Sequence, residues 1–363
     1  MESVARLEAA AASMIARADL DWIAECRLVK ISGNRPPWTP SGIHLTAGER
    51  VSVFVGGRAS VAAAPEIWVG AHFTLWMRID AAGEIFRAPS GGSYTFTAAH
   101  GGELFLGSLF PGDWADRSGA LSTDTRAWER VAGTIAVLVI RWKVEPAAGL
   151  ERLAGAHPGA AAMLHGEAAR LRKPPITPPG WRYLWSIGDA GIFDSRPGAA
   201  GQPRIECRVR DDAAILQRPI HAVLDETMRL RWRWKINALP SRIREDSVPS
   251  HDYLSVAVEF DNGQDLTYMW SAALEPETAF RCPIPRWSRR ETHMVIRCGQ
   301  AGLGDWVNEE RKIREDYSRA VGSPPGAIVA VWLIAVGIFS HTTGQCEYSG
   351  LELVTGDRSM ALI

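Results

Sequence analysis

A proline-rich segment divides the chain into two parts. Residues 173–180 read KPPITPPG, with four prolines in eight residues. Proline has a fixed φ and no backbone N–H, so we expect this segment to form a stiff, extended linker. The chain has 363 residues, and a typical domain length of about 150 residues also favours two domains. We therefore predict the main domain boundary at this segment.

Both parts carry the sequence pattern of β-strands. Residues 29–145 contain short alternating or β-branched runs separated by Gly-containing turns, which is typical of a β-sandwich or jelly roll. Residues 181–363 are β-rich as well, apart from the charged stretch 305–320, which we expect to be helical. The predicted fold class is therefore mainly β, with two jelly-roll-like β-sandwich domains.

Helices are expected in two other regions. Apolar residues recur at helical spacing near the start of the chain, so we predict an N-terminal helix within residues 1–28. Residues 146–172 are rich in Ala, Leu and Arg, and Pro158 is expected to split this helical region. Together with the proline-rich segment, it forms a predicted connector over residues 146–180.

Charge and motifs exclude several classes of protein. The 40 basic and 41 acidic residues nearly balance, which argues against nucleic acid as the partner, since that partner favours a basic excess. The sequence has no Walker P-loop, no G-x-G-x-x-G after a strand and no H-E-x-x-H, so we expect no cofactor. The five cysteines are odd in number and form no C-x-x-C. We therefore expect neither disulfides nor a metal site.

The localisation also follows from sequence pattern. The N-terminus lacks the basic and apolar regions of a signal peptide. The longest apolar run, residues 327–339, is shorter than the span of about 20 residues that a bilayer requires, so we read it as buried β-structure. We expect a cytoplasmic protein with reduced thiols and no membrane span. Its oligomeric state is left open.

Two alternating segments in the second half supply candidate catalytic residues. In residues 229–236 the apolar side chains share one face and four basic side chains share the other, so an acidic neighbour or an anionic ligand should lie opposite. In residues 251–261, His251 and Glu259 share one face, and Asp252 begins the other. These three residues could supply general acid–base chemistry, or Asp252 could instead bind backbone N–H groups. His341, in a polar turn after the long apolar run, is a further catalytic candidate.

Tryptophan is unusually frequent, with 15 residues in the chain. An indole ring offers a large apolar face and one N–H donor, so it suits either a sandwich core or the surface of a ligand site. Asp113 and Asp116 flank one Trp in a turn-rich loop and are candidate calcium ligands, although the loop has few other carboxylates. The predicted ligand-binding residues are Trp38, Trp114, Trp232, Trp234, Tyr253, Tyr268 and Trp270.

Residues 29–142 resemble the bacterial galactophilic lectin domain. The similarity rests on WTPSGIHLTAGERV at 38–51, GELFLGSLFPGDW at 102–114 and the strand GTIAVLVI at 133–140. The resemblance implies a small jelly-roll sandwich, and in such lectins a calcium ion holds galactose. The positions of the lectin's metal ligands read Ser108–Leu109 and Val131–Ala132 here. We therefore expect that calcium site to be absent.

Residues from about 181 to 354 resemble the DUF3047 family. The similarity rests on LRWRWKINALP at 230–240, HDYLSVAVEFD at 251–261 and GDWVNEERKIREDY at 304–317. The resemblance implies a β-sandwich. It implies no particular activity, because the family has none that is established. Its members carry acidic residues in the turn after the long strand, where this chain has Phe339, Ser340 and His341.

Two classes of function remain open at this point. One is a binding protein that recognises a carbohydrate or a flat apolar metabolite through Trp-lined sandwich surfaces. The other is a cofactor-independent hydrolase, lyase or isomerase, with a His/Asp acid–base pair in the C-terminal sandwich or at the domain interface. In either case we expect a small-molecule or carbohydrate ligand.

Overall fold

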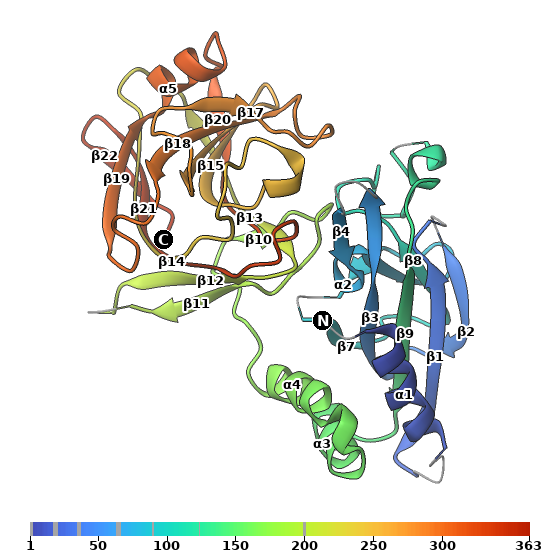
Figure 1. Ribbon diagram of the computed structural model, residues 1–363. Helices are drawn as coiled ribbons and strands as arrows, with labels where there is room; N and C mark the ends of the chain where they lie inside the picture. The colour runs from blue at the N-terminus through green and yellow to red at the C-terminus, as the bar shows by residue number, and fades with distance from the viewer. Residues whose placement is uncertain are drawn as a thin grey trace. The chain divides into compact units, whose positions relative to one another are not determined.

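The computed structural model describes residues 3–16, 21–34, 38–62, 67–88, 91–122, 124–198 and 201–363. The chain forms two compact units (Figure 1). The N-terminal unit contains Met1–Pro174 with Trp185–Ala190, and the C-terminal unit contains Pro175–Leu184 with Gly191–Ile363. Strands predominate in both units, so the predicted mainly β fold with an N-terminal helix and a helical connector is confirmed.

The N-terminal unit is built from two sheets. One has the order β1 (Ile23–Ser32), β9 (Thr134–Trp142), β3 (Arg50–Ala62) and β4 (Ile67–Gly70), and β7 (Ser93–Thr97) pairs with the first part of β3. The other has the order β2 (Thr39–Leu45), β8 (Gly102–Ser108), β5 (Leu75–Ile79) and β6 (Phe86–Arg87). Buried residues of both sheets, among them Val53, Val137 and Leu106, form one core cluster, as in a sandwich.

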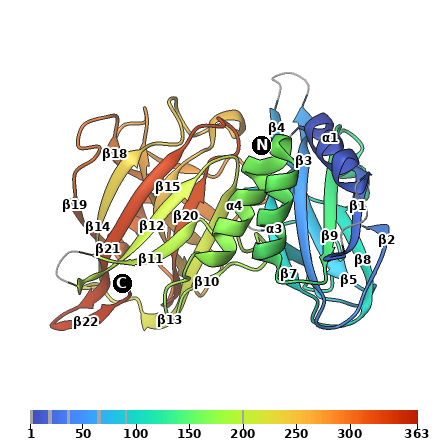
Figure 2. The same ribbon diagram turned by 90° about the horizontal axis from the view of Figure 1, so that it is seen from below.

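Helices cover the outer face of the first sheet. The helices are α1 (Val4–Ile15), α3 (Pro146–Ala156) and α4 (Ala161–Arg172), and a short α2 (Ala71–Thr74) follows β4. Apolar residues of α1, α3 and α4 pack with Leu138 and Ile140 of β9, which is therefore buried on both faces. Figure 2 shows α3 and α4 side by side. The predicted break at Pro158 is confirmed, because a 3-10 turn at Pro158–Ala160 separates them.

The C-terminal unit also contains two sheets. The first has the order β10 (Arg182–Tyr183), β13 (Ala213–Val223), β20 (Ala327–Val336), β15 (Leu254–Phe260), β16 (Asp265–Ser271), β18 (Glu291–Cys298) and β17 (Ala279–Arg281). The second has the order β11 (Phe193–Pro197), β12 (Pro203–Val209), β21 (Gly344–Thr355), β14 (Arg229–Ala238) and β19 (Val307–Lys312), and β22 (Arg358–Ala361) pairs with β21. The pairing of β16 with β18 is parallel. A 3-10 turn lies at Val248–Ser250 in this unit, and another lies at Thr125–Trp128 in the N-terminal unit.

Aromatic side chains join these two sheets. The ring centroid of Trp232 on β14 lies 5.7 Å from that of Tyr268 on β16. Trp234 on β14 lies 5.8 Å from Trp270 on β16. Because β14 and β16 belong to different sheets, these pairs form the interior of a sandwich.

The alternation predicted for residues 229–236 is present in β14, whose apolar side chains are buried. Its basic face meets acidic neighbours, because Arg229 and Arg231 both pair with Glu310 of β19. The helix predicted over 305–320 is correct only in its second half, where α5 spans Ile313–Ala320. Val307–Lys312 form β19 instead, because backbone pairing with β14 and these ion pairs outweigh the local helical preference.

Among the described residues, no helix has the length and apolar character needed to cross a bilayer.

Candidate metal centre

Two neighbouring strands of the C-terminal unit bring polar side chains into the protein interior. Residues two apart on a strand share a face, so Glu291 and His293 of β18 point the same way. The parallel pairing of β16 with β18 places Asp265 beside Glu291 and Thr267 beside His293. All four residues are buried. A row of buried polar groups is unusual in a sandwich core and marks a candidate site.

Two further residues complete this group. Cys282 directly follows β17, and its N–H donates to the carbonyl of Glu291 at 3.1 Å. His251 lies in the turn ahead of β15. One ligand atom from each of His251, Cys282, Glu291 and His293 lies within 4.8 Å of each of the others. We call these four residues the His2CysGlu cluster.

The cluster is closed to solvent, since its members are between 0 and 3% exposed. His251 donates from Nδ1 to the carbonyl oxygen of Glu245 at 2.6 Å, and its Nε2 lies 3.3 Å from Cys282 Sγ. His293 Nε2 lies 3.5 Å from Glu291 Oε1. Within the described part of the chain, neither ring nitrogen of His293 makes a hydrogen bond of ordinary geometry, and the contact with Glu291 is an ion pair at 3.5 Å. Buried polar groups ordinarily make such a hydrogen bond, so His293 is suited to bind a ligand that the protein itself does not supply.

Two of the four side chains have protonation states at pH 7 that suit metal ligation. Burial, together with the nearby His293, lowers the pKa of His251 to about 3, so its imidazole is neutral at pH 7. Burial alone would raise the pKa of Glu291, but the neighbouring His293 outweighs it and the pKa falls to about 2. Burial, followed by the charge of Glu291, raises the pKa of the Cys282 thiol, so metal binding must displace the thiol proton.

Two separations within the cluster match those of a tetrahedral zinc ion. Zinc bonds of about 2.0–2.1 Å to nitrogen and about 2.3 Å to sulfur place tetrahedral ligand atoms about 3.3–3.7 Å apart. The separations of 3.3 Å from Cys282 to His251 and 3.5 Å from His293 to Glu291 lie in that range. The hard ions Ca²⁺ and Mg²⁺ prefer oxygen donors, and one thiol with two imidazoles does not suit them.

Hydrogen bonds around the cluster hold the carboxylate in place. The hydroxyl of Tyr253 donates to Glu291 Oε1 at 2.8 Å, and the hydroxyl of Thr267 lies 3.5 Å from the same oxygen. The contact from His251 to the Glu245 carbonyl fixes that ring in the same way. Partners of this kind orient metal ligands and set the tautomer of a ligating histidine.

The Cys282–His251 contact could also belong to a nucleophile and its base. A catalytic cysteine is normally exposed to substrate and has a lowered pKa. Cys282 is buried, and the pKa of its thiol is raised. These observations favour metal ligation over nucleophilic catalysis.

The predicted catalytic residues are not brought together. Asp252 faces away from the cluster, and its carboxylate accepts the backbone N–H groups of Ile338, Phe339 and Ser340. Glu259 pairs with Arg290 at 2.8 Å. His341 Nδ1 lies 2.8 Å from Asp211 Oδ1, and both of these residues have positive φ. A catalytic role for His251, Asp252, Glu259 or His341 remains a prediction from sequence.

Most of the predicted ligand-binding aromatic residues are interior. Trp114, Trp232, Trp234, Tyr253, Tyr268 and Trp270 are each at most 3% exposed. Trp38 is half-buried, with the Arg78 guanidinium 4.5 Å from its ring and Trp114 stacked at 5.2 Å. That these residues contact a ligand stays a prediction.

Sequence reasoning missed Cys282, Glu291 and His293. A weak signal existed, because Glu-x-His on a strand places both side chains on one face, and a cysteine lies nine residues earlier. The expectation of no metal site rested on the absence of paired cysteines. A zinc site with a single thiolate needs no paired cysteines, so their absence does not exclude it.

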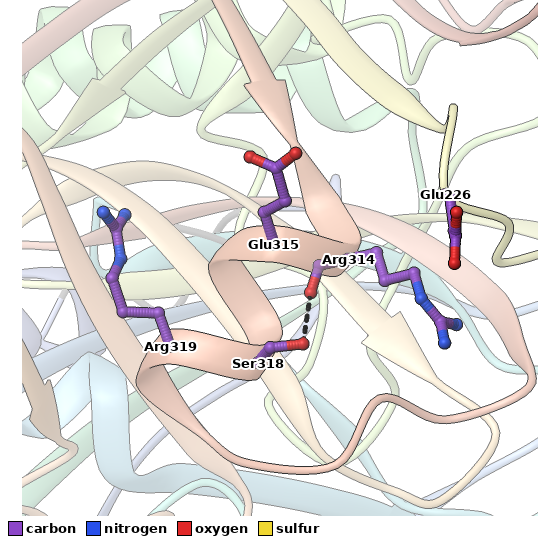
Figure 3. A pocket seen from close by; sticks show the side chains of 5 residues that line it. All are labelled: Glu226, Arg314, Glu315, Ser318 and Arg319. Carbon is purple, nitrogen blue, oxygen red and sulfur yellow. Dashed lines mark hydrogen bonds between the residues drawn. The ribbon is translucent and has the colours of Figure 1, made fainter.

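A shallow cavity of about 530 Å³ lies elsewhere on the C-terminal unit. It is lined by Glu226, Arg314, Glu315, Ser318 and Arg319, mostly from α5 (Figure 3). The hydroxyl of Ser318 donates to the carbonyl of Arg314 at 2.8 Å. Its wall contains neither an aromatic ring nor a predicted site residue.

Comparison with known proteins supports the DUF3047 resemblance seen in the sequence. The model of a family described as "Protein of unknown function (DUF3047)" matches residues 198–352. Among solved structures, the EclA N-terminal domain, a PllA-like lectin, is 17% identical, with 31% of this chain and 94% of that chain covered and a TM-score of 0.25. The xyloglucanase domain of NopAA from Sinorhizobium fredii is 7% identical, with 50% and 95% covered and a TM-score of 0.30. No curated protein matches this chain.

Proposed function

We propose that the C-terminal unit is a zinc-binding β-sandwich that holds one ion through the His2CysGlu cluster. The observation that carries this proposal is the meeting of four zinc-type ligands within 4.8 Å of one another in a closed interior. The buried ring of His293, which makes no hydrogen bond of ordinary geometry in the described residues, supports it.

The proposed role of the ion is structural. Four protein ligands complete a tetrahedral zinc shell and leave no position for water or substrate. The ligands come from the turn before β15, the residue after β17 and strand β18. An ion bound to all of them cross-links the edge of the seven-stranded sheet, and its binding free energy adds to folding stability.

The first experiment measures metal in the wild-type protein. Protein purified without added chelator should contain about one zinc ion per chain when measured by inductively coupled plasma mass spectrometry. Cobalt-substituted protein should show a thiolate-to-cobalt absorption band. Chelation should lower the melting temperature, since an ion present at about 1,000 times its Kd stabilises by about 4 kcal/mol. Wild-type protein that takes up neither metal would refute the proposal.

Matched variants locate the site. Cys282→Ala should lose the cobalt band, and His293→Ala should reduce the zinc content well below one per chain. Cys298→Ala removes a cysteine at the end of β18 that is not in the cluster, and His341→Ala removes a distant histidine. Both controls should retain zinc. If Cys282→Ala keeps the band while Cys298→Ala loses it, the ligand set is wrong.

A second candidate function is recognition of a carbohydrate or flat apolar metabolite by the N-terminal unit. Trp38 favours it, because this ring is half-buried and its orientation is held by Arg78 and Trp114. A thermal-shift screen against sugars and aromatic metabolites tests it, with Trp38→Ala expected to abolish the shift. Chelation should leave such binding intact, because Ser108–Leu109 and Val131–Ala132 replace the lectin's metal ligands. Loss of sugar binding on chelation would contradict this.

A further inference from the structure

The proposed zinc ligands Cys282 and Glu291 lie at the two ends of one loop. Their side chains meet in the cluster, so a bound ion would close residues 282–291 into a ring. The loop itself is compact, because the N–H groups of Ser288 and Glu291 donate to the carbonyls of Ile284 and Trp287 at 2.9 and 2.8 Å. We call residues 281–290, from the last residue of β17 to the residue before β18, the arginine loop.

The arginine loop has a one-sided charge. Residues 281–290 read RCPIPRWSRR, with four arginines and no acidic residue. Arg281, Arg286 and Arg289 are exposed. Arg290 is the exception, because it turns inward to Glu259 and Asp265 at 2.8 and 3.3 Å and lies over Trp287.

Gln264 contacts the side chain of one of these arginines and the backbone of another. Its amide oxygen accepts a hydrogen bond from Arg281 Nη1 at 2.8 Å, and its amide nitrogen donates to the carbonyl of Arg289 at 2.9 Å. Arg281 and Arg289 form no ion pair with a carboxylate in the described part of the chain. An exposed acidic residue, Glu277, lies four residues before Arg281, and it pairs with Arg311 and Arg319.

We propose that the arginine loop binds an acidic polysaccharide, with Arg281 and Arg289 holding its carboxylates. Guanidinium groups bind planar oxyanions through paired N–H donors. The half-buried ring of Trp287 lies within the same loop and provides an apolar edge for a sugar ring. Nucleic acid is the other polyanion with matching charge, and the oligothymidylate control below separates it from an acidic polysaccharide.

This proposal rests on the proposed zinc site, since the ion holds the two ends of the loop. Removing the ion should therefore weaken polysaccharide binding, although no arginine is a zinc ligand. The two proposals remain separable, because zinc content and polysaccharide binding are measured independently.

The test uses full-length protein and a short oligomer of galacturonic acid, titrated by calorimetry at low salt. Its methyl ester, which lacks the negative charges, is the first control, and a single-stranded oligothymidylate is the second. Wild-type protein should bind the acidic oligomer, and the methyl ester should not bind. Arg281→Gln and Arg289→Gln should each weaken binding about tenfold, as expected for the loss of one charged hydrogen-bond donor. Arg358→Gln changes an exposed arginine of β22 and should have no effect.

Each result supports or overturns the proposal. Equal binding of the acid and the methyl ester, or unchanged binding by the Arg281→Gln/Arg289→Gln double variant, overturns it. Tighter binding of the oligothymidylate assigns the loop to nucleic acid instead and also overturns it. If zinc-loaded protein does not bind the acidic oligomer, the polysaccharide proposal alone is refuted. Protein that lacks zinc but binds the oligomer refutes the zinc proposal alone and leaves the arginine assignment in place.

Discussion

Replacing Asp252 tests whether its carboxylate stabilises the turn at residues 338–340. Its carboxylate is fully buried and accepts N–H groups from Ile338, Phe339 and Ser340 at 2.5 to 3.1 Å. These N–H groups belong to the turn between β20 and β21, which are strands of opposite sheets. Asp252 therefore fixes the turn at one end of the C-terminal sandwich.

The magnitude follows from the number of N–H groups that lose their partner. Each unsatisfied donor costs about 1–3 kcal/mol, and water can reach the half-buried part of this turn, so Asp252→Ala should cost about 3–5 kcal/mol. Asp252→Asn keeps one acceptor oxygen but turns an amide N–H₂ toward a backbone donor. It should cost about 1–2 kcal/mol.

The assay is urea unfolding of the full chain, followed by tryptophan fluorescence and fitted with separate transitions for the two units. Asp305→Ala changes an exposed aspartate before β19 and serves as the matched control, with an expected change below about 0.5 kcal/mol. If Asp252→Ala unfolds at the wild-type urea concentration, the anchoring role is refuted. An effect as large in Asp305→Ala would show that the assay does not report this turn.

Three further predictions concern other parts of the chain. Gly57→Ala should destabilise the N-terminal unit by about 3 kcal/mol or more in calorimetry, because φ is +107° and a Cβ would lie 2.1 Å from the Thr134 carbonyl oxygen; a wild-type melting temperature would contradict this. Trp234→Ala should lower the free energy of unfolding of the C-terminal unit by about 3–5 kcal/mol in urea, because it leaves a cavity beneath β16 and removes the hydrogen bond to Glu309. A loss below about 1 kcal/mol would argue against a tightly packed sandwich. The hydrogen bond and charge of Arg311 lower the pKa of Glu277, so this pair stabilises the folded state above the ordinary value of 4.5 and the contribution is lost as the pH falls below it. Glu277→Gln should flatten the decline in melting temperature between pH 5 and pH 3 seen for wild type, and an unchanged slope would refute the assignment.

Local sequence patterns predict those elements whose conformation depends on residues close together in the chain. In residues 229–236 the alternation of apolar and basic side chains predicts β14, because a strand necessarily presents alternate residues to opposite faces. Pro158 predicts the break between α3 and α4, because proline cannot donate the hydrogen bond that a continuous helix requires. The helix predicted over 305–320 is correct only in its second half, because the first half gains more from pairing with β14 than from forming a helical turn.

The candidate metal centre depends on contacts between distant parts of the chain. His251 and Asp252 are adjacent in sequence, yet the first joins the His2CysGlu cluster and the second holds the turn at 338–340. No local pattern separates these two roles, because each is set by which strand lies opposite. The sequence by itself determined two mainly β units with a helical connector, because strand periodicity and helix breaks are local properties. Only the tertiary structure brought His251 to Cys282, Glu291 and His293, because this meeting requires the parallel pairing of β16 with β18 and the return of β17 along the sheet edge.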